Sequence, residues 1–206
     1  MRLELTPDQL KALRKASGLI RACDVEGYFE LKGLYGQPGK QARDEFEKKF
    51  AAYYGVGRRS VSFRQQYFRL FFADSFQGQD PYTAPLQALH AFNQMLECSF
   101  VSKMVAFHDE SWPIDDRNVR QFFGLTVSSN ASHDLDSRIR VFVCQMNDLK
   151  ECYRSLATEP SFIPVIQSVR TRFGDAIPGI KRCHDARIVD FMVWTAVDRK
   201  LTSRLG

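Results

Sequence analysis

Apolar side chains recur at helical spacing over most of this chain, and no alternation typical of a β-strand persists for long. The first helix is predicted to begin at Thr6, which can cap it, with Pro7 at its first position and Gln9 at its third. Seven further helices are predicted over residues 40–54, 60–72, 86–107, 116–123, 137–156, 162–173 and 181–201. The pattern therefore predicts an all-α protein.

Glycine, proline and polar runs mark the expected breaks between helices. Four glycines and Pro38 predict a loop or a broken segment over residues 27–39. A polar loop is expected over residues 126–134 and a turn over residues 174–179, while Val61-Ser62-Phe63 is a weak strand-like exception. We predict one domain over residues 1–206, of about eight helices in two packed lobes, with a seam near residues 80–125 and both termini in the same lobe.

Composition excludes several classes of protein. The 206-residue chain is 44% hydrophobic but contains no run of about 18 apolar residues, so no membrane span is expected. The first five residues carry an early acid and no apolar core, which argues against a signal peptide. Five scattered cysteines and four histidines show no metal-ligand spacing. We therefore expect a cytoplasmic protein with reduced cysteines, no metal and no cofactor.

The net charge of +5 permits binding to an anionic polymer without requiring it. Basic residues gather in two clusters, which comprise Arg58, Arg59, Arg64 and Arg69, and Arg170, Arg172, Lys181, Arg182 and Arg187, with Arg199 and Lys200 beyond. Solvated helix faces and a nucleic-acid surface both remain open for these clusters. The aromatic stripe over residues 60–72 could stack on bases, although its helical spacing favours a place in the core.

The richest chemistry lies where an apolar helix ends and the next helix begins. Lys103 stands among apolar neighbours, and a buried lysine has a lowered pKa and can act as a nucleophile. Asp115 and Asp116 follow a Trp-Pro turn and open the next helix, where a carboxylate can cap backbone amides. A lysine that reaches solvent or pairs with Asp109 or Glu110, beside a purely capping aspartate, is the alternative.

The segment from Ile114 to Arg120 resembles the aspartate-bearing helix start of the helix-hairpin-helix DNA glycosylases, which include 8-oxoguanine glycosylases and endonuclease III. The segment can be aligned with the family's motif in two registers. In one register Asp116 takes the place of the catalytic aspartate, with Asn118 and Val119 after it. In the other register Asp115 takes that place. We favour Asp116 because only that register puts Val119 on the buried face. Ser102-Lys103-Met104-Val105 resembles the region that bears the lysine of bifunctional members, and residues 185–194 resemble the family's closing helix.

The resemblance implies that a base of double-stranded DNA is flipped into a pocket and excised by a monomeric enzyme without a cofactor. Asp116, or Asp115, would assist cleavage of the N-glycosidic bond, and Lys103 could form a Schiff base and add lyase activity. The residues implied to contact DNA are Arg117, Asn118, Arg120, Lys181 and Arg182. The aromatic residue implied to stack on the base is Trp112, with Phe122, Phe123 and Trp194 as alternatives.

The chain differs from the family in two respects. The family's hairpin is glycine-rich and holds a phosphate through backbone amides, but residues 97–102 contain no glycine. Only thirteen positions separate Lys103 from Asp116, fewer than in typical members. A second hypothesis therefore stays open, namely a non-catalytic helical module that binds nucleic acid or protein. For an active enzyme, both repair and defence against foreign DNA remain open.

Overall fold

The computed structural model describes residues 3–73, 80–125 and 134–201. Within these ranges it contains ten α-helices, two short 3-10 helices and no strand, so the predicted all-α fold is confirmed. The α-helices are α1 (Pro7–Ser17), α2 (Ala22–Tyr35), α3 (Lys40–Tyr53), α4 (Val61–Phe71), α5 (Thr83–Asn93), α6 (Cys98–His108), α7 (Arg117–Phe123), α8 (Leu135–Thr158), α9 (Ile163–Phe173) and α10 (Asp185–Asp198). The 3-10 helices are η1 (Val56–Arg58) and η3 (Pro178–Lys181). No helix of the described ranges is long and apolar enough to cross a bilayer.

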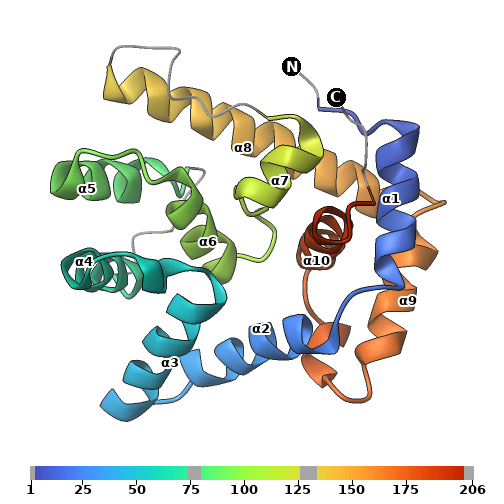
Figure 1. Cartoon of the computed structure of the whole chain (residues 1–206), viewed down its shortest axis with the longest axis horizontal. Coiled ribbons are helices and arrows are strands. Elements are labelled where there is room, and N and C mark those ends of the chain that lie inside the picture. The colour runs from blue at the N-terminus through green and yellow to red at the C-terminus, as the bar shows by residue number, and fades with distance from the viewer. Residues whose placement is uncertain (1–2, 74–79, 126–133, 202–206) are drawn as a thin grey trace.

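Helix α10 is central to one half of the molecule. Figure 1 views it nearly end-on, and it packs against α1, α7, α8 and α9. Eleven of its fourteen residues are buried, as expected from the apolar residues around most of its circumference. Because α1 packs directly on α10, the first and last described helices belong to the same part of the fold.

Helices α3 to α6 form the other half, and α2 and α8 run between the two halves along opposite edges of the view in Figure 1. The core here is largely aromatic, with the rings of Phe46, Phe50, Phe71 and Phe107 in mutual contact. The buried aromatic residues of α4 are Phe63, Tyr67, Phe68 and Phe71. The stripe over residues 60–72 is therefore core, and the strand-like Val61–Phe63 is the first turn of a helix.

The start of α1 follows the sequence prediction closely. The Thr6 hydroxyl accepts a hydrogen bond from the Gln9 amide at 3.2 Å, and the Gln9 side-chain oxygen accepts one from the Thr6 amide at 2.8 Å. This reciprocal pair satisfies two backbone donors that the first helical turn leaves free. The Gln9 amide group also donates to the carbonyl of Phe122, which ties α1 to the end of α7.

The predicted loop or broken segment over residues 27–39 is correct only for residues 36–39, because α2 continues to Tyr35. Its residues Val25, Tyr28 and Leu31 are buried at three-residue spacing, and this packing outweighs the cost of about 1 kcal/mol for a glycine within a helix. Gly27 also has a packing role. A Cβ atom at this position would lie 3.0 Å from the Tyr53 ring, so the small residue allows α2 and α3 to approach closely.

The single helix predicted over residues 86–107 is in fact two helices. Helix α5 ends where Gln94 adopts a left-handed conformation with φ of 59°, and α6 begins at Cys98. Side chains hold the turn: Asn93 accepts from the Met95 amide at 3.0 Å and donates to Glu97 at 2.7 Å. This break and the added α2 account for ten helices where about eight were expected.

One boundary of a predicted helix also differs, and one predicted loop lies largely outside the described residues. Residues 178–181 form η3, so the last helix begins at Asp185 rather than near Lys181. The predicted loop over residues 126–134 lies outside the described residues except for Asp134, which caps α8 by accepting from the Ser137 amide at 2.8 Å.

Candidate functional site

Lys103 extends from the middle of α6 toward the end of α3. Its Nζ donates a hydrogen bond of 3.1 Å to the carbonyl oxygen of Tyr54 and lies 5.5 Å from the centre of the Phe100 ring. Burial lowers the pKa of Lys103, and the charges of Asp116 and Asp115 oppose that fall. The ammonium group is thus partly desolvated, which favours the neutral, nucleophilic amine.

Asp116 is the cap of α7. Its Oδ1 accepts from the Val119 amide at 3.0 Å, and the Val119 side chain is buried in the core. Burial raises the pKa of the Asp116 carboxyl, whereas the Val119 amide and the charge of Lys103 oppose the rise. The side chain is half-buried and combines a capping role with a perturbed protonation equilibrium.

Lys103 and Asp116 act on each other electrostatically, since each charge favours ionisation of the other group. Their hydrogen bonds nevertheless go to different partners, Tyr54 for the lysine and Val119 for the aspartate. Neither side chain is therefore locked in a direct ion pair with the other. A nucleophilic amine beside a carboxylate is an arrangement that can attack an electrophilic carbon and stabilise the cation that develops.

The side chain and backbone of Asp115 are both bound to other residues of the fold. The side chain is fully buried and forms a two-pronged ion pair with the Arg120 guanidinium, in which Nε donates at 2.8 Å. Its backbone amide donates to the Ser102 hydroxyl at 2.9 Å, and that hydroxyl donates to the Asp115 carbonyl at 3.2 Å. The structure therefore argues against a catalytic Asp115 and a phosphate-binding Arg120, because the buried carboxylate and the partly exposed guanidinium neutralise each other.

Trp112 does not offer a face for a flipped base. The side chain is 6% exposed, the Tyr82 ring meets it edge-on at 5.2 Å, and the Lys150 Nζ lies 3.6 Å above its centre. The sequence expectation of a base-stacking Trp112 is therefore corrected. Phe122 and Phe123 are also buried in the core.

Trp194 lies close to the end of α3 that binds Lys103, and it is less buried than Trp112. Its side chain is half-buried, and its ring centre lies 6.3 Å from that of Tyr54, whose carbonyl binds Lys103. The Trp194 Nε1 is buried and has no hydrogen-bond partner among the described residues. A buried donor without an acceptor is costly, so a ligand or water atom at this position would stabilise it.

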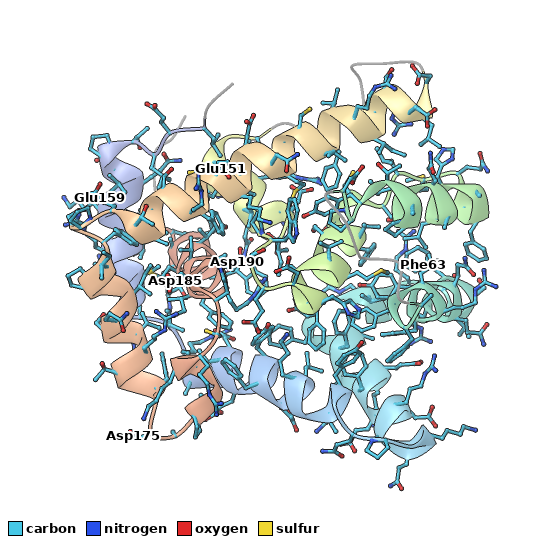
Figure 2. All side chains as sticks on the ribbon, turned by 180° about the vertical axis from the view of Figure 1, so that it is seen from behind. Phe63, Glu151, Glu159, Asp175, Asp185 and Asp190 are labelled. Carbon is cyan, nitrogen blue, oxygen red and sulfur yellow. The ribbon has the colours of Figure 1, made fainter. Side chains whose placement is uncertain are left out.

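The other residues expected to contact DNA have mixed surroundings. Arg117 and Arg182 are exposed. Lys181 is also exposed and forms an ion pair of 3.1 Å with Asp175, labelled in Figure 2. Asn118 donates to Asp198 at 3.2 Å, which links the first turn of α7 to the end of α10.

The second basic cluster largely serves the fold. Arg170 donates to the Cys183 carbonyl at 2.8 Å and pairs with Asp185, and Arg172 donates to the Ile20 carbonyl at 2.9 Å. Arg187 is 1% exposed. Only part of the positive charge counted in the sequence is therefore available to an external anion.

A buried polar cluster on α10 escaped the sequence analysis. Arg187 pairs with Asp190, which Figure 2 labels on the central helix, and the Tyr153 hydroxyl donates to Asp190 at 2.9 Å. Burial raises the pKa of the Asp190 carboxyl, while Arg187 and Tyr153 oppose the rise. The available signal was an arginine and an aspartate three positions apart within an otherwise apolar helix, a spacing that places both on one face.

Tyr54 was also missed as a site residue. Its side chain is 4% exposed, and burial raises its pKa, with Arg187 opposing the rise and Asp190, Glu110 and Asp116 adding to it. These four charged groups, from α10, the loop after α6 and the start of α7, thus all act electrostatically on the phenol. The sequence placed Tyr54 only as the end of a helix, and nothing in its local pattern signals this convergence.

Glu110 anchors the start of the loop that follows α6. It accepts from the Tyr28 hydroxyl at 2.7 Å and the His184 amide at 2.9 Å and pairs with Lys32 at 3.1 Å. Burial opposes ionisation of Glu110, but these partners outweigh it and lower its pKa. Lys103 is therefore not the partner of Glu110 that the sequence alternative allowed.

The described residues contain no cluster of histidine, cysteine, aspartate and glutamate suited to a metal ion. Comparisons with protein families, with curated proteins and with solved structures find no match for this chain. The argument for function therefore depends on the arrangement of the side chains themselves.

Proposed function

We propose that this protein is a DNA glycosylase that excises a damaged or modified base. The observation that carries the proposal is the electrostatic coupling of Lys103 on α6 to Asp116 at the start of α7, with the lysine pKa lowered and the aspartate pKa raised. Neighbouring groups of opposite charge with perturbed pKa values are typical of catalytic sites, although structural networks also produce them.

The proposed chemistry begins with a base flipped out of the duplex. As the bond between C1′ and the base nitrogen lengthens, positive charge develops on the sugar and the Asp116 carboxylate stabilises it. Water then attacks C1′, or the neutral Lys103 amine attacks it and the base leaves with the bonding electrons. In the second route the sugar ring opens to a Schiff base, which permits strand cleavage by β-elimination.

Contacts outside the reacting centre would hold the DNA. The exposed Arg117, Lys181 and Arg182 would contact phosphates, and Trp194 would offer its buried indole N–H to the base. Arg120 and Trp112 are absent from this proposal for the reasons given above. We further propose a monomer that acts on double-stranded DNA in the cytoplasm, in either repair or defence against foreign DNA.

The corresponding proposal for the fold is a glycosylase-like helix-hairpin-helix arrangement in two lobes. Helices α5 and α6 with the turn between them would be the hairpin, and α7 would carry the catalytic aspartate. The left-handed Gln94 allows this tight turn without a glycine. Its conformation supports the hairpin assignment but not a phosphate-binding role, which depends on free backbone amides.

A non-catalytic helical module is the second candidate. The observation in its favour is that Asp116 accepts from the Val119 amide at 3.0 Å, a bond that a purely structural helix cap would also make. In this alternative, Lys103 serves only to bond the carbonyl at the end of α3. The protein would then bind nucleic acid or another protein without excising a base.

The two candidates are separated by a base-release assay on duplexes that carry a broad panel of lesions, combined with borohydride trapping. The proposal expects release of at least one base, and for the bifunctional form a trapped covalent complex that Lys103→Ala abolishes. Lys150→Ala is the matched control, because Lys150 is also half-buried with a pKa lowered by burial. No release across the panel, with binding intact, would favour the non-catalytic module.

A further inference from the structure

The loop between α6 and α7 determines where Asp116 stands relative to Lys103. Helix α6 makes its last backbone bond from the Asp109 amide to the Val105 carbonyl, and α7 begins only at Arg117. The carbonyls of the last helical turn and the amides of the loop therefore need partners from elsewhere. One turn of α10 supplies several of them.

Arg187 holds the first part of this connection. Its Nη2 donates to the Ala106 carbonyl in the last turn of α6 and to the Trp112 carbonyl in the loop, each at 3.2 Å. The cation thus bridges two backbone groups that are six positions apart. It also places positive charge at the end of α6, where the helix dipole favours a cation.

Asp190 acts on the second part of the connection electrostatically. Arg187 and the Tyr153 hydroxyl bind its carboxylate, and the backbone amide of Ile114 favours the ionised form of that carboxylate. Ile114 is two residues before Asp116, so this interaction acts on the approach to α7. Arg187 thus binds the backbone at Ala106 and Trp112, and Asp190 holds Arg187 in place.

Stability alone is a poor explanation for these charges. Replacing a buried ion pair with apolar side chains of similar volume is often neutral or stabilising. Apolar residues cannot, however, bond the carbonyls of Ala106 and Trp112. The feature that only the polar pair supplies is a defined path for the loop backbone.

We infer that Arg187 and Asp190 are positioning residues, which hold the backbone between α6 and α7 from one turn of α10 and thereby fix Asp116 relative to Lys103. The catalytic meaning of that placement rests on the function proposed above. We call the contacts of Arg187, held by Asp190, with the carbonyls of Ala106 and Trp112 the clamp. The clamp is a property of the folded chain and is tested without DNA.

The test compares the wild type with the triple variant Arg187→Met, Asp190→Leu, Tyr153→Phe, which approximates the packing volume and leaves no buried side-chain charge unpaired. Hydrogen exchange of the Ile114 and Val119 amides is measured by NMR, with the buried Met146 of α8 as the reference. Loss of one hydrogen bond corresponds to about tenfold faster exchange. We expect at least that acceleration at Ile114 and Val119, with Met146 unchanged. A folded variant with wild-type exchange at both amides would overturn the inference.

Two further measurements keep the test decisive if the triple variant does not fold. In the wild type, Ile114 and Val119 should open together with the α10 amides as denaturant is added, and opening well before α10 would contradict the clamp. In Arg187→Lys, which retains the charge but lacks the guanidinium fork that binds Asp190 through one nitrogen and both carbonyls through the other, the Asp116 carboxyl pKa should move toward its ordinary value. An unchanged titration would contradict it. Failure to release any base would count against the proposed function alone, since no readout here involves DNA.

Discussion

Lys103 donates its hydrogen bond to the carbonyl oxygen of Tyr54, at 3.1 Å, and not to the nearby carboxylate of Asp116. The lysine is held in place by a neutral acceptor, which bears no full charge to favour the protonated form. The amine and the carboxylate therefore influence each other's pKa but do not form a hydrogen bond with each other.

Lys103 should titrate below the exposed lysines of the chain, because burial disfavours its charged form. The measurement is NMR of reductively ¹³C-methylated protein, with Lys103→Arg to assign the signal. Asp116→Asn should lower the Lys103 pKa further, because the negative charge of Asp116 favours the ammonium. An increase in that variant, or an ordinary lysine pKa in the wild type, would contradict the described environment.

Replacing Arg120 should reduce the free energy of unfolding more than replacing its ion-pair partner Asp115. Arg120→Met leaves a fully buried carboxylate unpaired and should reduce the free energy of unfolding by about 3–5 kcal/mol. Asp115→Asn leaves an arginine whose side chain is 21% exposed and can reach water, so a smaller loss of about 1–2 kcal/mol is expected. Urea denaturation measures both, and equal losses would contradict the burial difference.

Glu110 should stabilise the fold in a pH-dependent way. Its pKa is lowered in the folded state, so its contribution is fully present above the unfolded pKa, about 4.5, and is lost as the pH falls through the folded value. The denaturation midpoints of wild type and Glu110→Gln should therefore differ at pH 7 and converge in acid. A constant difference from pH 7 to pH 3 would exclude this linkage.

DNA affinity should depend on salt through the exposed cations alone. Each phosphate contact that is lost lowers the slope of log K against log salt by about 0.9. Arg117→Ala and Arg182→Ala should each reduce the slope by about this amount in fluorescence titrations. Arg172→Met is the control, because Arg172 is also exposed but its guanidinium nitrogens already bond the backbone carbonyls of Ser17 and Ile20. An effect of Arg172→Met equal to that of Arg117→Ala and Arg182→Ala would contradict the proposed surface.

The sequence predicted the parts of this fold that depend on local chemistry. The reciprocal hydrogen bonds of Thr6 and Gln9 and the helix cap at Asp116 use side chains within three residues of the backbone groups they bind. The missed helix α2 depends instead on tertiary packing. The break at Gln94 is held by local bonds of Asn93, and no glycine or proline marks it.

The same distinction applies to the site. Lys103 and Asp116 could be singled out from neighbouring motifs in the chain. The roles of Asp115, Trp112 and Arg187 could not, because each depends on a distant or buried partner that periodicity does not reveal. Arg187 in particular contacts Ala106 and Trp112, which precede it by more than seventy positions.

Asp116 offers the most direct test of the central claim, since catalysis and capping make different demands on its side chain. Asparagine retains a cap oxygen for the Val119 amide but carries no negative charge, whereas alanine loses both and should cost about 1 kcal/mol of stability.

The deciding measurement is the single-turnover rate of base release from a lesion-bearing duplex by wild type, Asp116→Asn and Asp116→Ala, each with its free energy of unfolding. The account predicts that Asp116→Asn remains as stable as the wild type within about 0.5 kcal/mol and loses base release. Base release by Asp116→Asn at the wild-type rate would contradict it.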